Sequence, residues 1–136
     1  MLKLCSSITR THEGHEYFFV DGVFTWNQAR AACLKKRGTL AMAGDSATFD
    51  VLRSMFDQYR AESGSAVGVW LDGKQEESGI WQCDTNNYEC GPNMPWVNGA
   101  PPQLNSGYCV LIWHSRADGV ANYPCTKGMP AICEVK

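Results

Sequence analysis

The chain has 136 residues, of which 44% are hydrophobic and 19% are charged, a balance typical of a folded globular domain. Its formal net charge of -2 supplies no basic field, so we expect neither a nucleic-acid partner nor attraction to an acidic membrane surface. No apolar run approaches the roughly 20 residues of a membrane-spanning helix, and we therefore expect no membrane insertion.

The first half of the chain predicts a strand followed by two helices. The aromatic and β-branched run at 16–20 is typical of a strand. Thr25 is a candidate N-cap for the first helix, and Gly38 is expected to end it. Asp45 or Ser46 is expected to cap the second helix. Its apolar residues step by three and four onto one face: Phe49, Leu52, Phe56 and Tyr59.

The second half predicts strands around a long loop. Residues 67–71 have the composition of a buried strand, whereas residues 72–107 are rich in Gly, Pro, Asn and Ser and show no helical period. A loop of this length in a compact domain is usually functional. Further strands are expected at 108–113, 119–124 and 131–135. Two helices followed by antiparallel strands indicate the α+β class, and we expect residues 1–136 to form one domain.

Cysteine is the most informative residue type in the composition. The chain has seven: Cys5, Cys33, Cys83, Cys90, Cys109, Cys125 and Cys133. Their spacings include no C-x-x-C pair and suit neither a zinc ribbon nor an iron–sulfur cluster. Reduced cysteines in a cytosolic protein are one reading, but an oxidised, secreted framework is favoured. Because seven is odd, one thiol is either free or paired with another chain.

Several short motifs together indicate a family. They run from the first helix to the last strand, at residues 25–33, 38–41, 69–73, 79–81, 94–96, 109–111, 124–125 and 131–134. Among them, Trp26 and Cys33 in the first helix and the Ala-Ile-Cys-Glu segment at 131–134 are characteristic. The pattern resembles the C-type lectin-like family from about Tyr17 to the C-terminus. The resemblance implies an α+β fold in which two helices pack on antiparallel sheets beside a long irregular loop region.

The resemblance also implies a disulfide pattern. The family pairs Cys33 with Cys133 and Cys109 with Cys125. Cys83 and Cys90 lie close together in the long loop, and we expect them to bridge each other. Cys5 is then left over, so it is a free thiol or the site of an interchain bridge in a disulfide-linked homodimer.

Family members that bind sugar hold calcium in the long loop, and calcium requires six to eight oxygen ligands. The triplet that supplies several of them reads Ala-Pro-Pro at 100–102 in this chain. Gly107 stands where the family has an acid, and the Trp-Asn-Asp stretch reads Val-Ala-Asn, so that only Asn122 keeps an oxygen. We therefore expect no cofactor and no calcium at the usual site.

Two alternatives keep a polar site open. Gln103 and Asn105 are candidates for a displaced triplet, with or without calcium. Asp72, Glu76 and Glu77 are weak candidates for an auxiliary calcium site, although a solvated acidic loop explains them more simply.

Aromatic and amide residues around the long loop are the candidates for ligand binding, because Tyr and Trp are favoured both at interfaces and at sugar-stacking sites. Trp26, Trp70 and Trp81 are expected in the core instead. The predicted ligand-binding set is Trp96, Asn98, Gln103, Asn105, Tyr108, Asn122 and Tyr123.

These observations favour an extracellular, non-enzymatic recognition module that binds a protein or glycan ligand through its long-loop face. A carbohydrate-binding lectin with a shifted site and an assembly domain that dimerises through Cys5 are the alternatives. An enzyme is disfavoured because no acid–base–nucleophile arrangement surrounds His114. The first residues lack the apolar stretch of a signal peptide, so we expect any native signal or anchor to lie outside this chain.

Overall fold

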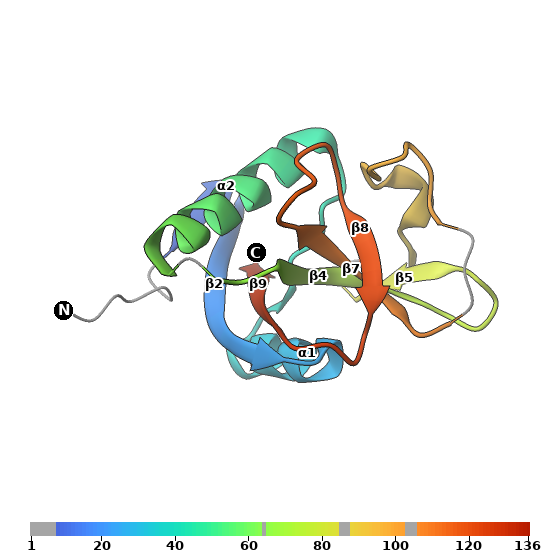
Figure 1. Cartoon of the computed structure of the whole chain (residues 1–136), viewed down its shortest axis with the longest axis horizontal. Coiled ribbons are helices and arrows are strands. Elements are labelled where there is room, and N and C mark those ends of the chain that lie inside the picture. The colour runs from blue at the N-terminus through green and yellow to red at the C-terminus, as the bar shows by residue number, and fades with distance from the viewer. Residues whose placement is uncertain (1–7, 64, 85–87, 103–105) are drawn as a thin grey trace.

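The computed structural model describes residues 8–63, 65–84, 88–102 and 106–136 (Figure 1). Within these ranges the chain forms nine strands, two α-helices and one 3-10 helix. Their bounds are β1 (Thr9–His12), β2 (His15–Phe24), α1 (Trp26–Lys35), β3 (Thr39–Leu40), α2 (Ser46–Ser63), β4 (Gly68–Gln75), β5 (Trp81–Cys83), β6 (Tyr88–Glu89), η2 (Gly91–Asn93), β7 (Tyr108–Trp113), β8 (Ala121–Pro124) and β9 (Met129–Val135).

The strands pair into a sheet whose main path has the order β1-β2-β9-β4-β5-β6. From this path, β3 pairs with β9, and the β7–β8 hairpin joins through β4. The expected antiparallel pairing holds except between β4 and β9, which run parallel where Trp70 faces Ala131. Parallel strands need a long connection, and the chain between β4 and β9 includes the long loop and the β7–β8 hairpin.

The two helices lie on opposite sides of the sheet, and each covers one hydrophobic core (Figure 1). The α2 side contains the four residues predicted for the apolar face of that helix, all of them buried. The α1 side contains Trp26 and Trp70, and Trp81 is buried on the α2 side, so the three predicted core tryptophans are confirmed. This arrangement confirms the predicted α+β class, with two helices packed on a mainly antiparallel sheet.

Helix α1 begins as its sequence predicts and ends earlier than expected. The Thr25 hydroxyl accepts a hydrogen bond from the Gln28 N–H at 3.2 Å, and the Gln28 side chain accepts one from the Thr25 N–H, which completes a capping box. The helix ends at Lys35, and Arg37 adopts a left-handed conformation with φ of 65°. Gly38 has a packing role, because a Cβ there would lie 2.5 Å from the Glu134 carbonyl oxygen in β9.

The carboxylate of Asp45 caps helix α2. Its Oδ1 atom accepts a hydrogen bond from the Thr48 N–H at 2.8 Å, and this bond lowers the pKa of Asp45 below its usual value. Because the folded-state pKa is depressed, the cap stabilises the fold above the unfolded pKa. That stabilisation is lost as pH falls through the folded pKa.

Replacement of Asp45 by alanine is expected to lower the free energy of unfolding by about 1 kcal/mol at pH 7, because the Thr48 N–H loses its acceptor. Asp45→Asn is the matched control, since asparagine caps about as well and does not titrate. Urea denaturation at neutral and acidic pH measures both. A wild-type advantage over Asp45→Ala that persists unchanged below the depressed pKa would contradict this role.

Three disulfides staple the described residues. They are Cys33–Cys133, Cys83–Cys90 and Cys109–Cys125, with Cα–Cα distances of 5.5, 5.8 and 5.2 Å. These are the pairs expected from the resemblance and from the proximity of the two loop cysteines. Cys5 lies outside the described residues, so its pairing stays a prediction.

The segment expected to be an irregular loop is partly ordered into regular structure. β4 extends to Gln75, and the two short strands β5 and β6 and the helix η2 follow within the predicted loop. Strands of two or three residues are too short to show an alternating pattern, and the surrounding Gly, Pro and Asn residues mask them further. Strand β1 was also missed, and β2 extends beyond the predicted 16–20 at both ends.

Candidate functional site

A pair of tryptophans supports the long loop from inside. The rings of Trp81 and Trp96 lie 5.0 Å apart between centroids, at an interplanar angle of 56°. The Trp96 indole Nε1 donates a hydrogen bond of 2.7 Å to the Gly91 carbonyl oxygen. The disulfide between Cys83 and Cys90 connects β5 to the residue before η2. These contacts hold the described base of the loop in place.

Backbone hydrogen bonds join the loop to the segment before β8. The Val120 N–H donates to the Pro95 carbonyl at 2.8 Å, and the Val97 N–H donates to the Val120 carbonyl at 3.0 Å. Gly119 allows this approach, because a Cβ there would lie 2.3 Å from the Pro95 carbonyl oxygen. The loop and the β7–β8 hairpin thus form one surface, which we call the long-loop face and define by Asn98, Ala100, Tyr108 and Asn122.

Trp96 was predicted to bind ligand, and the structure corrects that prediction. Only 4% of Trp96 is exposed, its ring packs on Trp81, and its N–H is used by Gly91. A residue so enclosed offers no surface to a ligand. Its position beside the Gly- and Pro-rich loop suggested a role in binding, but the residues that pack on it, Trp81 and Val120, are distant in sequence.

The usual calcium positions contain few oxygen ligands. Ala100 is exposed, Pro101 and Pro102 are half-buried, and Gly107 is exposed, so the long-loop face presents mainly apolar groups there. Asn122 is half-buried in β8, opposite Val110. Within the described ranges no group of three or more His, Cys, Asp or Glu side chains gathers to hold a metal ion. One amide does not match the oxygen-rich shell that calcium requires.

The auxiliary calcium prediction is corrected at Asp72. This residue is fully buried, and its Oδ1 atom accepts a hydrogen bond of 3.0 Å from the Asp84 N–H. Asp72 therefore has a structural role and is not open to an ion from solvent. Glu76 and Glu77 are exposed, and Asp72 does not share a surface with them.

The remaining predicted ligand-binding residues divide between two faces of the β7–β8 hairpin. Side chains alternate along a strand, so Tyr108 and Asn122 lie on the face that also contains Val110. Tyr123 faces Cys109 and lies on the other side, where its ring is 5.0 Å from that of Trp113. Asn98 is exposed in the loop. Gln103 and Asn105 lie outside the described residues.

A polar pocket of about 260 Å³ lies between α1, β4 and β5. Its lining residues are Trp26, Asn27, Arg30, Lys74, Glu76, Gln82 and Asp84. Arg30 and Asp84 form an ion pair across it, and the Lys74 ammonium lies 5.8 Å from the Trp26 ring centroid. Two of its charged side chains, Arg30 and Asp84, thus neutralise each other, and we assign this pocket no ligand. Sequence reasoning missed it, since its residues come from three separate elements.

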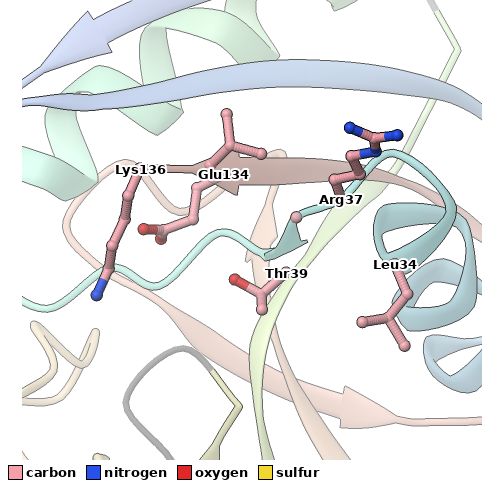
Figure 2. A pocket seen from close by; sticks show the side chains of 7 residues that line it. Leu34, Arg37, Thr39, Glu134 and Lys136 are labelled. Carbon is pink, nitrogen blue, oxygen red and sulfur yellow. The ribbon is translucent and has the colours of Figure 1, made fainter.

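A larger hollow of about 480 Å³ lies where α1 ends and β9 leaves the sheet. Figure 2 shows Leu34 and Arg37 on the helix side, Glu134 and Lys136 on the strand side, and Thr39 between them. The Arg37 guanidinium and the Lys136 ammonium point away from each other. The hollow therefore lacks converging charges, and we assign it no ligand.

A third hollow, of about 250 Å³, contains a buried carboxylate whose two oxygens are both used. Glu134 accepts from the Met42 N–H at 2.8 Å, and its other oxygen lies 2.7 Å from Nδ1 of His15. Burial, together with the Glu134 charge, raises the pKa of the neighbouring Tyr17 to about 12. Tyr17 is thus uncharged at neutral pH, and this cluster joins β2, β9 and the segment before α2.

Two further observations concern the surroundings of His114 and the helices. His114 packs its ring against Trp113, with centroids 5.4 Å apart, and its backbone N–H donates to the Val67 carbonyl at 2.9 Å. No described helix of the structure combines the length and the apolar character needed to cross a membrane.

Comparison with known families gives one match. The model described as "Lectin C-type domain" matches residues 23–135, which is most of the chain. A search of curated protein sequences gives no significant match.

Solved structures share the fold at low sequence identity. Human lithostathine has 21% identity and a TM-score of 0.78, covering 98% of this chain and 91% of its own. SPL-2 from Saxidomus purpuratus, described as a calcium-independent C-type lectin, has 19% identity and a TM-score of 0.75, covering 95% and 91%. SPL-1 in complex with GlcNAc has 19% identity and a TM-score of 0.74, covering 96% and 94%. At these identities the likeness concerns the fold.

Proposed function

This chain belongs to the C-type lectin domain family, and on that premise we propose that it is a non-enzymatic recognition module that works without calcium at the usual site. Its ligand, a glycan or a protein, binds on the long-loop face, with Asn98, Tyr108 and Asn122 as the contacting residues. Gln103 and Asn105 belong to the same proposal, since they fall between Ala100 and Tyr108 in the chain.

One observation carries the proposal: protein contacts hold the described part of the long loop, whereas the usual calcium positions keep a side-chain oxygen only at Asn122. The Trp81–Trp96 pair and the Cys83–Cys90 disulfide hold the loop, and Val120 joins it to the hairpin. Contacts of this kind do not require an ion. The binding surface is then pre-organised, which reduces the entropy lost on binding.

Support for a glycan as the ligand comes from similar solved structures rather than from contacts in this chain. SPL-2 is described as a calcium-independent lectin and SPL-1 was solved with GlcNAc, so glycan binding without calcium is compatible with this fold. The three disulfides favour an oxidising, extracellular location. A homodimer linked through Cys5 is part of the proposal. On a non-reducing gel we expect a dimer band that Cys5→Ser abolishes.

Thermal unfolding is expected to be the same in millimolar calcium and in excess chelator. An ion present at 100 times its dissociation constant adds about 2.7 kcal/mol, which in a domain of this size raises Tm by about 5–15 °C. Because only Asn122 offers a side-chain oxygen at the usual calcium positions, we expect a difference below about 1 °C. Differential scanning calorimetry makes the comparison.

Binding is tested separately on an array of immobilised glycans, with and without calcium. Asn122→Ala and Asn98→Ala are expected to reduce any signal equally in both conditions. A Tm increase of several degrees in calcium, or glycan binding that a chelator abolishes, would overturn the calcium-free proposal. Glycan binding that neither variant affects would show that the long-loop face is not the binding site.

A further inference from the structure

The face of the β7–β8 hairpin turned away from the long loop has a partly exposed aromatic cluster. Trp113 and Tyr123 lie 5.0 Å apart between ring centroids, at an interplanar angle of 42°, and the His114 ring lies 5.4 Å from that of Trp113. All three side chains are half-buried. We refer to Trp113, His114 and Tyr123 as the hairpin aromatic surface.

Trp113 differs from the other four tryptophans of the chain. Those four are at most 5% exposed and belong to the two cores, whereas Trp113 packs only its inner side against the core that α1 covers. Neighbouring aromatic side chains that stay partly exposed to solvent are typical of recognition surfaces.

The surface is held rigidly from behind by one arginine of α2. The Arg53 guanidinium donates hydrogen bonds to the carbonyls of Trp113 at 3.0 Å, His114 at 3.0 Å and Arg116 at 2.8 Å. Its Nε atom donates to Asp57 at 3.0 Å. The turn that ends β7 is therefore fixed, and the rings that it presents are pre-organised for a ligand.

Charge at this surface indicates a neutral ligand. The Arg53 guanidinium is occupied by three carbonyls and a carboxylate, and Arg116 pairs with Asp118 at 3.2 Å. Among the hydrogen bonds of the described ranges, none engages the Tyr123 hydroxyl or the His114 imidazole, so each has hydrogen-bonding capacity at the edge of the rings. A ligand with an apolar C–H face and hydroxyl groups at its rim matches this arrangement.

We propose that the hairpin aromatic surface is a second binding site, for a neutral pyranose unit of a glycan that stacks on Trp113 and Tyr123. The site is independent of the proposed function, because Tyr123 and the long-loop face lie on opposite sides of the hairpin.

The test uses chitotriose and a galactose-terminated trisaccharide as neutral probes, with a heparin oligosaccharide as the anionic comparison. A neutral probe is expected to reduce acrylamide quenching of tryptophan fluorescence at least twofold, because Trp113 is the tryptophan that solvent reaches. Titration calorimetry measures affinity in the same samples. Tyr123→Ala is expected to weaken binding about tenfold through the lost ring contact.

Matched variants separate this site from the long-loop face. Trp113→Phe keeps a ring and is expected to retain binding while it removes the change in quenching, and Tyr123→Phe tests the hydroxyl alone. Asn122→Ala, on the opposite side, is expected to weaken any binding at the long-loop face and to leave the change in Trp113 quenching intact. Circular dichroism confirms folding of each variant.

Three results would overturn the proposal. They are no quenching change with either neutral probe, tighter binding of the heparin oligosaccharide than of both neutral probes, and binding that Asn122→Ala abolishes but Tyr123→Ala leaves intact. The last result would assign the sugar to the long-loop face and so support the proposed function while rejecting this site.

Discussion

Replacing Cys33 and Cys133 by alanine is expected to lower the free energy of unfolding by about 4–5 kcal/mol. The disulfide closes a loop with a sequence separation of 100 residues, and in the chain-entropy model the loss grows with the logarithm of that length. Both cysteines are fully buried, where they join α1 to β9. Since small domains are stable by only about 5–15 kcal/mol, the variant is expected to be marginal at 37 °C.

The matched control removes the Cys109–Cys125 disulfide, whose sequence separation is 16. The same model predicts a loss of about 3 kcal/mol for this shorter loop. Urea denaturation of both double-alanine variants gives the two values directly. Equal losses, or a larger loss for the shorter loop, would show that packing rather than chain entropy sets the contribution of these disulfides.

Trp96→Ala is expected to destabilise the protein by about 3–5 kcal/mol, because it removes a large buried ring that packs on Trp81. The substitution also leaves the Gly91 carbonyl without its donor. This loss is measured by urea denaturation in the absence of any ligand. Binding should be lost with it, since the long-loop face depends on the loop's position.

Trp96→Phe is the informative partner of this substitution. It keeps an aromatic ring against Trp81 but removes the indole N–H, so we expect a loss of about 1–3 kcal/mol for the unsatisfied carbonyl. If instead Trp96→Ala were as stable as the wild type and lost only ligand binding, the earlier ligand-contact interpretation of this residue would be correct.

Local sequence signals predicted the helices well because the relevant interactions are short in range. Thr25 caps α1 through a residue three positions away, and Asp45 does the same for α2. The apolar face of α2 needs only helical spacing to be recognised. The disulfides were predicted from the family pattern, since connectivity cannot be derived from the cysteine spacing itself.

The site was less predictable because it depends on contacts between distant elements. Trp96 and Asp72 were assigned to ligand and calcium binding from residue type. In the structure Trp96 packs on Trp81, and the buried Asp72 accepts a hydrogen bond from the Asp84 N–H, so both have structural roles. The separation of Tyr108 from Tyr123 depends on register in the β7–β8 hairpin, which a one-residue slip would reverse. Arg53 gave no signal in the sequence, because its partners lie 60 to 63 residues away.

The position of β9 in the sheet has a consequence for biosynthesis. β9 lies between β2 and β4 in the sheet, yet it is made after both of them on the ribosome. A nascent chain lacking it therefore exposes the edges of β2 and β4 and both apolar faces, a state prone to pairing with other chains. We expect the domain to acquire its native sheet only once residues 129–135 have left the ribosome, so folding is a late, cooperative event that benefits from chaperones.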